Sequence, residues 1–220
     1  MADLHDATEH YLETILAIEE EGIRPIRARI VERLGLSAAA VSETVERLVD
    51  AGYVKLHEDR SLHLTGPGRS LATTVVRRHR LAERLLADVI GLEWEKVHEE
   101  ADRWEHAISA DVEEKLVELL GDPATCPHGN PIPGSKKQTR PEPTVALRDV
   151  TTGSVTVTRI SEKLELSADG LSFVARARLM PGCSATVTNA GEEGIAVHTT
   201  TGEHLVPFEI AEHLHVTVPI

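Results

Sequence analysis

Aromatic side chains are scarce in this sequence of 220 residues, where they make up only 3% of the chain. Proteins that bind single-stranded nucleic acids stack the bases on aromatic rings, so this composition argues against that class. Cysteine is equally rare, and Cys126 and Cys183 provide neither a disulfide framework nor a C-x-x-C metal site. No apolar run reaches the ~18 residues that a membrane-spanning helix requires. The first six residues contain no basic or apolar region, which predicts no signal peptide and a cytoplasmic protein.

Basic residues are outnumbered by acidic ones, 23 to 36, which gives a formal net charge of −13. A chain this acidic is not ordinarily expected to bind DNA. The 41% of apolar residues is ordinary for globular proteins, and the length allows one large domain or two to three small ones. Twelve histidines suggest metal or pH chemistry, although surface positions would also account for many of them.

The N-terminal third has the element order of a winged helix-turn-helix. Apolar residues at helical spacing predict helices over about the first twenty residues, over 27–34 and over 38–50. Ser37 is a suitable N-cap for the third helix. Two short strand-like runs, 53–56 and 62–64, predict a hairpin. A small α+β domain that binds no nucleic acid is the alternative interpretation.

The remaining chain predicts a helical segment followed by a β segment. Helices are expected over about 68–90, 94–107 and 110–120, and residues 126–144 are rich in proline and glycine. Alternating residues from 154 onward predict a small all-β barrel. The expected fold is therefore mostly α with a β C-terminal domain. Its parts are a winged helix-turn-helix domain (1–73), a helical domain (74–140), a linker (141–150) and an SH3-like β-barrel (151–220).

Charge is unevenly distributed along the chain. Residues 1–21 contain seven acidic residues and no Lys or Arg, whereas residues 24–60 contain seven basic and six acidic residues. The predicted DNA-reading segment is therefore nearly neutral. Because phosphate contacts dominate affinity for DNA, we expect weak binding until positive charge is added or a dimer geometry is fixed.

Histidines and carboxylates recur at helical spacing in the predicted helical domain. Residues at i, i+3 and i+4 share one helix face, and imidazole and carboxylate groups at this spacing suit a divalent transition metal. The alternative is a solvated acidic face, because residues 93–122 contain eleven acidic residues. The pattern favours metal ligation, since it involves two adjacent helices and a histidine of the first helix. The residues are His98, Asp102, Glu105 and His106 in one helix, His79 and Glu83 in the preceding helix, and His10.

Most of these residues lie in segments that resemble the DtxR/MntR family of metal-dependent transcriptional repressors, on its three-domain, iron-repressor-like branch. The resemblance is close over residues 1 to about 140 and loose in the last domain. The segments that carry it are Arg27-Ala28-Arg29-Ile30 with Leu36-Ser37, residues 78–86, Val97-His98-Glu99-Glu100-Ala101, Arg103-Trp104-Glu105-His106 and Gly129-Asn130-Pro131-Ile132-Pro133-Gly134.

The resemblance implies two metal ions per subunit. The primary set would be His10, Asp102, Glu105 and His106, and the ancillary set would be His79, Glu83 and His98. The iron-repressor pattern has methionine at the position of His10 and cysteine at that of Asp102. Imidazole and carboxylate in place of sulfur suit harder ions such as Mn²⁺, so we expect a manganese-responsive repressor of metal homeostasis genes. An Fe²⁺-responsive repressor is the alternative, and Co²⁺ or Zn²⁺ are possible substitutes for the ion.

The resemblance also implies that a Glu and a Gln of the third domain add to the ancillary set. A loose alignment places Ser167 and Gly170 there, and neither is a plausible ligand. Asp169 and Glu165 are near enough to substitute, but a polar turn without a metal role is the favoured interpretation of this segment.

The second helix of a helix-turn-helix enters the major groove with its N-terminal residues near the base edges. Family members have Gln where this chain has Glu43. A glutamate can accept a hydrogen bond from the cytosine amino group but cannot donate one, so the operator preference would differ. The alternative is that Glu43 points away from the DNA. The candidate contacts are Ser37, Ala38, Ala39, Ser42 and Glu43 for bases, and Arg27, Arg29, Arg47 and Arg60 for phosphates.

A metal ion is expected to act by stabilising one orientation of the first helix relative to the helical domain. The resemblance implies that residues 74–140 form the metal-binding and dimerisation domain. It also implies a homodimer bound to double-stranded palindromic operator DNA, with two dimers on one operator as the alternative. No enzymatic activity is expected. The alternative, a metallohydrolase, would require a general base beside the metal, and the sequence contains no recognisable one and no H-E-x-x-H helix. A metal-buffering or peptide-binding module is a third interpretation. Apolar residues suited to a dimer interface or a core are Val89, Ile90, Leu92, Trp94, Val112, Leu116, Val117, Leu119 and Leu120.

Overall fold

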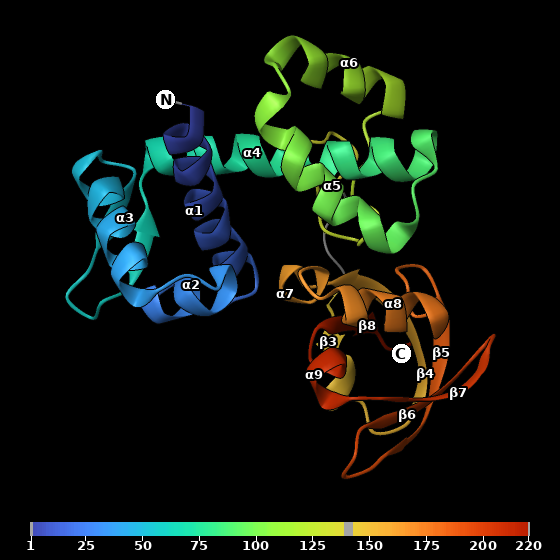
Figure 1. Cartoon of the computed structure of the whole chain (residues 1–220). Coiled ribbons are helices and arrows are strands. Elements are labelled where there is room, and N and C mark those ends of the chain that lie inside the picture. Colours follow the sequence, from blue (N-terminus) through green and yellow to red (C-terminus); the bar gives the residue numbers. More distant parts are fainter. Residues whose placement is uncertain (1, 139–142, 220) are drawn as a thin grey trace. The chain divides into compact units, whose positions relative to one another are not determined.

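The structure, a computed structural model, describes residues 2–138 and 143–219 (Figure 1). The chain forms two compact units, residues 1–78 and residues 79–220, and each unit has its own core. Within the described residues, none of the helices combines the length and hydropathy that crossing a membrane requires.

The first unit contains α1 (Ala2–Glu20), α2 (Arg27–Leu34), α3 (Ala38–Asp50) and the start of α4 (Gly66–Arg84). Helix α2 ends at Gly35, which adopts a left-handed conformation at φ 64°, and the Ser37 hydroxyl accepts the Ala40 N–H at 3.2 Å at the start of α3. Strands β1 (Val54–Leu56) and β2 (Leu62–Leu64) pair antiparallel. These elements confirm the predicted winged helix-turn-helix, whose core includes Leu12, Ile15, Ile30, Val41, Val45 and Leu62.

The helical part of the second unit differs from the sequence prediction at two places. The helix expected to reach residue 90 changes at Arg84 into a π-helical turn, η1 (Leu85–Ile90). The helix expected over 94–107 is α5 (Val97–Trp104) between two 3-10 turns, η2 (Trp94–Lys96) and η3 (Glu105–Ala107). Helix α6 (Ala110–Leu120) has the predicted bounds, because Ser109 caps its start and the left-handed Gly121 ends it.

The β part of the second unit is one antiparallel sheet with strand order β3-β8-β4-β5-β6-β7. Its hydrophobic core includes Leu147, Val157, Ile160, Val197 and Leu214. The strands are β3 (Val145–Ala146), β4 (Gly153–Ile160), β5 (Ser184–Ala190), β6 (Ile195–Thr199), β7 (Gly202–Val206) and β8 (Leu214–Thr217).

The prediction of an all-β domain is wrong in detail, because short helices interrupt the strands. Helices α7 (Glu162–Glu165) and α8 (Ala168–Arg176) lie between β4 and β5, and α9 (Phe208–Ala211) precedes β8. Residues 141 and 142 of the expected linker lie outside the described residues. Its later part contributes β3 and the 3-10 turn η4 (Leu147–Asp149), and Leu147 is fully buried in the core.

Candidate functional site

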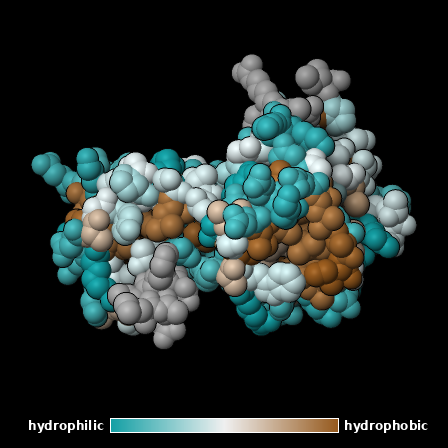
Figure 2. Space-filling model, turned by 90° about the horizontal axis from the view of Figure 1, so that it is seen from above, coloured by the Kyte–Doolittle hydropathy of each residue, from teal (hydrophilic) through white to brown (hydrophobic). Residues whose placement is uncertain are grey.

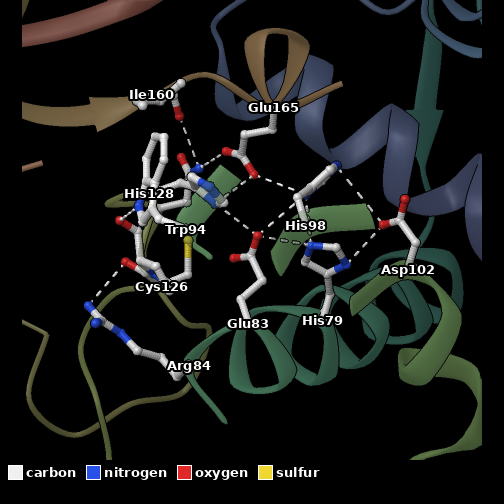
Figure 3. Close-up of polar contacts among 12 residues, drawn as sticks. His79, Glu83, Arg84, Trp94, His98, Asp102, Cys126, His128, Ile160 and Glu165 are labelled. Carbon is white, nitrogen blue, oxygen red and sulfur yellow. Dashed lines mark hydrogen bonds and ion pairs between the residues drawn. The ribbon is translucent and has the colours of Figure 1, made fainter. Parts of the chain in front are cut away.

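A cluster of buried ionisable side chains lies in the second unit (Figure 3). His79 and Glu83 come from α4, where the spacing of four residues places both on one helix face. The buried His98 and the half-buried Asp102 come from α5. Glu105, which follows in the 3-10 turn η3, is 1% exposed. The structure therefore brings together residues that the sequence assigned to two separate metal sites.

Glu83 is at the centre of this cluster and is completely buried. Its Oε1 lies 3.4 Å from His79 Nε2 and 3.4 Å from His98 Nδ1. His79 and His98 also contact each other, with His79 Nε2 3.0 Å from His98 Nδ1. The predicted ancillary set is thus one contiguous group of side chains.

Three residues of the predicted primary set adjoin the same group. His79 Nδ1 lies 2.6 Å from Glu105 Oε2 and 3.2 Å from Asp102 Oδ1, and His106 Nε2 lies 3.4 Å from Glu105 Oε1. The fourth residue, His10, is an exposed residue of α1 in the first unit. Its membership of the primary set stays a prediction.

Two further side chains face Glu83 and His98: His128, which was not predicted as a ligand, and Glu165, which was considered only as a substitute for a third-domain ligand. His128 is fully buried, and its Nδ1 lies 2.9 Å from Glu83 Oε1. Glu165, in α7, places Oε2 3.1 Å from His98 Nδ1. Its other oxygen accepts a hydrogen bond from the Asn130 side-chain amide at 2.5 Å. No local sequence pattern marks the approach of Glu165, because tertiary packing brings it across from another part of the chain.

The polar-turn interpretation of the third-domain segment is therefore wrong for Glu165, which is 5% exposed and contacts the histidines. Asp169 is an exposed residue in the first turn of α8, not part of a turn between elements. Ser167 caps α8 by accepting the Gly170 N–H at 3.1 Å. Gly170 has no room for a side chain, since a Cβ there would lie 2.6 Å from Leu164 Cδ1.

The cluster is held together electrostatically. Burial lowers the pKa of His79, but hydrogen bonds to Asp102, Glu105 and Glu83 outweigh this and raise the pKa well above its ordinary value. Burial likewise opposes protonation of His98, whose pKa is raised well above the usual range by Glu165 and Glu83. Burial also opposes ionisation of Glu83, yet the neighbouring imidazoles of His128 and His79 hold its pKa well below normal.

The donor set fits a divalent metal. Buried ionised carboxylates are costly unless they are paired or coordinate a metal. Two buried atoms of the cluster, Glu83 Oε2 and His128 Nε2, have no hydrogen-bond partner among the described residues. Imidazole nitrogens and carboxylate oxygens are the ligands of Mn²⁺, Fe²⁺, Co²⁺ and Zn²⁺. His79, Glu83 and His98 place one such atom each within 4.8 Å of one another.

The predicted DNA contacts lie in the first unit, mostly at exposed positions. Only Ser42 and Arg27 are half-buried. Arg29 pairs with Glu32 at 2.9 Å, and Arg47 donates to the Thr44 hydroxyl at 2.9 Å. The exposed candidates are Ser37, Ala38, Ala39, Glu43, Arg29, Arg47 and Arg60.

Comparison with known proteins matches the chain to two family models. Residues 3–62 match the family model of the iron-dependent repressor N-terminal DNA-binding domain, and residues 65–134 match that of the iron-dependent repressor metal-binding and dimerisation domain. The chain is 44% identical to the iron-dependent repressor IdeR of Mycobacterium tuberculosis, over 98% of this chain and 99% of that protein. The chain belongs to the iron-dependent repressor family. It is thus a metal-dependent transcriptional repressor of the DtxR type.

Other members support this placement. The diphtheria toxin repressor of Corynebacterium diphtheriae is 58% identical over 134 residues, which are 61% of this chain and 59% of that protein. A manganese-dependent transcriptional repressor in complex with manganese is similar in structure, with a TM-score of 0.83 and 30% identity over 96% of this chain and all of the other. IdeR of T. acidophilum has a TM-score of 0.77 and 28% identity over 96% of this chain and 97% of the other. Both iron- and manganese-dependent repressors are therefore among its relatives.

Proposed function

We propose that this repressor is activated by Mn²⁺ and binds operator DNA of metal homeostasis genes. The observation that carries the proposal is the chemistry of the primary set, in which His10 and Asp102 replace the two sulfur ligands of the iron-repressor pattern. The carboxylate of Asp102 lies 3.2 Å from His79 Nδ1, beside the buried Glu105. Ligand sets rich in oxygen suit Mn²⁺ better than they suit softer ions.

The primary ion would be held by His10, Asp102, Glu105 and His106, and the ancillary ion by His79, Glu83 and His98. When bound, an ion supplies positive charge that offsets repulsion among these carboxylates. His10 belongs to the DNA-binding unit and the other three primary residues belong to the second unit. Ligation by both would therefore favour one arrangement of the units and, with it, DNA binding.

An Fe²⁺-activated repressor is the second candidate. It is favoured by the similarity to IdeR, an iron-dependent repressor to which this chain is 44% identical. Affinity of a given site generally increases from Mn²⁺ to Fe²⁺ and Co²⁺, so selectivity for Mn²⁺ would have to come from geometry and cellular supply.

The proposed repressor acts as a homodimer on a palindromic operator. Among the apolar residues considered for the interface, Leu116 is buried in the core, whereas four are at least 48% exposed: Val89, Ile90, Val112 and Leu119. Figure 2, viewed from the α6 side, shows a broad hydrophobic area over this part of the molecule. The match to a dimerisation-domain model supports assigning this surface to the dimer.

The proposed contacts to DNA follow from the exposed start of α3. Ala38 and Ala39 would meet thymine methyl groups, and Ser42 and Glu43 would bond base edges. The Ser37 hydroxyl already caps the helix by accepting the Ala40 N–H, so a contact with DNA would be additional to that hydrogen bond. Phosphates would be bound by Arg27, Arg29, Arg47 and Arg60.

The test is a mobility-shift titration of a genomic operator pool against buffered free Mn²⁺ or Fe²⁺ under anaerobic conditions. The wild-type protein is compared with the double variant His10→Met/Asp102→Cys. We expect a shift that requires Mn²⁺ and a preference that moves toward Fe²⁺ in the double variant. Activation of the wild type by Fe²⁺ at much lower free metal than Mn²⁺ would reject the manganese assignment. The absence of a metal-dependent shift at any accessible level of Mn²⁺, Fe²⁺, Co²⁺ or Zn²⁺ would return the metallohydrolase and metal-buffer interpretations.

A further inference from the structure

The β1–β2 hairpin of the first unit, residues 54–64, carries two histidines side by side. This hairpin is the wing of the winged helix-turn-helix. His57 follows β1, and His63 lies in β2 opposite Lys55. The ring centroids of the two histidines are 4.4 Å apart, and both residues are exposed. The wing therefore presents two imidazoles together to the solvent.

Hydrogen bonds hold His63 in position and fix one of its protons. The Ser61 hydroxyl donates to Asp59 Oδ1 at 2.6 Å, and the Ser61 oxygen lies 3.0 Å from His63 Nε2. A hydroxyl has a single proton to donate, so His63 Nε2 must donate to the serine oxygen. Nδ1 is therefore the atom at which His63 gains or loses a proton.

Asp59 keeps its negative charge throughout the range in which histidines titrate. Hydrogen bonds from the Ser61 hydroxyl and N–H, together with the positive charge of Arg24, hold the pKa of Asp59 below its ordinary value. Arg24 Nη1 lies 3.1 Å from Asp59 Oδ2. Histidine is the side chain whose charge ordinarily changes between about pH 5 and 8. A change in the charge of the wing near neutral pH therefore comes from its histidines.

The wing is electrically neutral when both histidines are neutral. Residues 54–64 contain two basic and two acidic side chains, Lys55, Arg60, Glu58 and Asp59. Arg24, from the segment before α2, is paired with Asp59, and α3 contributes the apolar Val49 to this surface. Protonation of both histidines changes the formal charge of the wing from zero to +2.

The two histidines adjoin the surface that is proposed to meet DNA. The N–H of Arg60, a proposed phosphate contact, donates to the His57 carbonyl at 2.9 Å, so both residues belong to one turn. An open hollow of about 1060 Å³ is lined by Val49, near the end of α3, and by His57 and His63. A DNA backbone that contacts Arg60 is therefore within reach of both imidazoles.

We propose that His57 and His63, when protonated, bind a phosphate of the DNA backbone, so that this repressor binds DNA more tightly as the pH falls from about 8 to about 6. The inference rests on the proposed function, because it requires the wing to meet DNA. Two imidazolium ions this close repel each other, and a phosphate bound by both offsets that repulsion. Binding of DNA would therefore be coupled to the uptake of protons, since a nearby anion favours the charged form of an imidazole.

The sign of this effect separates it from the effect of pH on metal binding. Metal ligands bind in their deprotonated form, so a fall in pH weakens metal binding and, with it, metal-activated DNA binding. Protonation of the wing acts in the opposite direction. An affinity for DNA that increases at low pH is therefore not explained by the metal sites.

The test measures the affinity of full-length protein for two labelled duplexes by fluorescence anisotropy between pH 6 and 8. One is the operator at saturating Mn²⁺, where doubling the metal at each pH must leave the curve unchanged, and the other is a non-specific duplex in chelator at low salt. We expect the wild type to bind about three- to tenfold more tightly at pH 6 than at pH 8. The slope of log affinity against log salt should also steepen by about one.

The two duplexes distinguish failure of this inference from failure of the proposed function. A protein that never binds the operator specifically rejects the proposed function, whereas the non-specific duplex still tests the wing. Affinities that do not increase at low pH on either duplex, or no binding to either, would overturn the inference.

Variants assign the effect to the wing. His57→Gln/His63→Gln should lose the tighter binding at pH 6, and His57→Lys/His63→Gln, with one fixed charge, should bind more tightly than the double glutamine variant at pH 8. The matched control is His198→Gln, at an exposed histidine of β6 in the second unit, which should keep the pH dependence of the wild type. All three positions are exposed, so we expect the variants to fold, and thermal unfolding checks this. A pH dependence that survives His57→Gln/His63→Gln, or that disappears in His198→Gln, would contradict the assignment.

Discussion

Replacing Glu83 with Gln in the metal-free protein removes the charge at the centre of the cluster while nearly preserving its shape. Glu83 is completely buried, and its Oε1 lies 2.9 Å from His128 Nδ1 and 3.4 Å from nitrogens of His79 and His98. Removing one partner of a buried ion pair costs about 3–5 kcal/mol, because the opposite charge is left uncompensated. For a chain of this size, we expect a fall in Tm of about 6–20 °C.

The effect should depend on pH in a defined way. The raised pKa values of His79 and His98 stabilise the fold below their ordinary value of 6.5, and this contribution is lost as the pH rises through the raised values. The lowered pKa of Glu83 stabilises the fold above its ordinary value of 4.5, and this contribution is lost as the pH falls through the lowered value. The difference between wild type and variant should therefore be largest between pH 4.5 and 6.5.

Thermal and urea unfolding of chelator-treated protein at several pH values measure this difference. The matched control is Glu93→Gln, at an exposed glutamate that pairs with Lys96 at 3.3 Å, because exposed ion pairs contribute little to stability. The reasoning is refuted if Glu83→Gln behaves like Glu93→Gln at pH 5.5, or if its effect does not vary with pH.

The remaining predictions concern other parts of the protein. Arg47→Ala should weaken operator binding and reduce the salt slope by about one, measured by fluorescence anisotropy against salt concentration; an unchanged slope would remove Arg47 from the phosphate contacts. Gly129→Ala should lower Tm, because a Cβ would lie 2.1 Å from the Thr158 carbonyl oxygen, and an unchanged Tm would contradict this close packing. Burial and the charge of Glu165 raise the pKa of Glu162 to about 7, so stability is lost as the pH rises from 4.5 to 7. Unfolding of metal-free Glu162→Gln should show less of this loss, and an identical pH profile would contradict the shift.

Local signals accounted for the helices that the sequence predicted well. Helix α2 ends at the left-handed Gly35, and Ser37 and Ser109 cap α3 and α6. Each of these features acts within a few residues, so it is visible in the sequence. By contrast, α7 has only four residues and no helical periodicity that could be recognised among the strands.

The cluster could be predicted only in part for the same reason. His79 and Glu83 are four residues apart on one helix, and this spacing predicts their proximity. His128 reaches Glu83 across 45 residues, and Glu165 reaches His128 across 37 more. Such contacts depend on tertiary packing, here the hydrogen bonds of Asn130 and the close approach at Gly129, and neither leaves a periodic pattern.

The most direct test of the central claim is operator affinity at controlled free metal. An operator recovered from the genomic pool is labelled and titrated with wild-type protein under anaerobic conditions, at matched series of free Mn²⁺ and Fe²⁺. The account predicts no specific binding without metal and activation by Mn²⁺ at a free concentration no higher than that required for Fe²⁺. Specific binding in chelator, or activation by Fe²⁺ at much lower free metal, would contradict it.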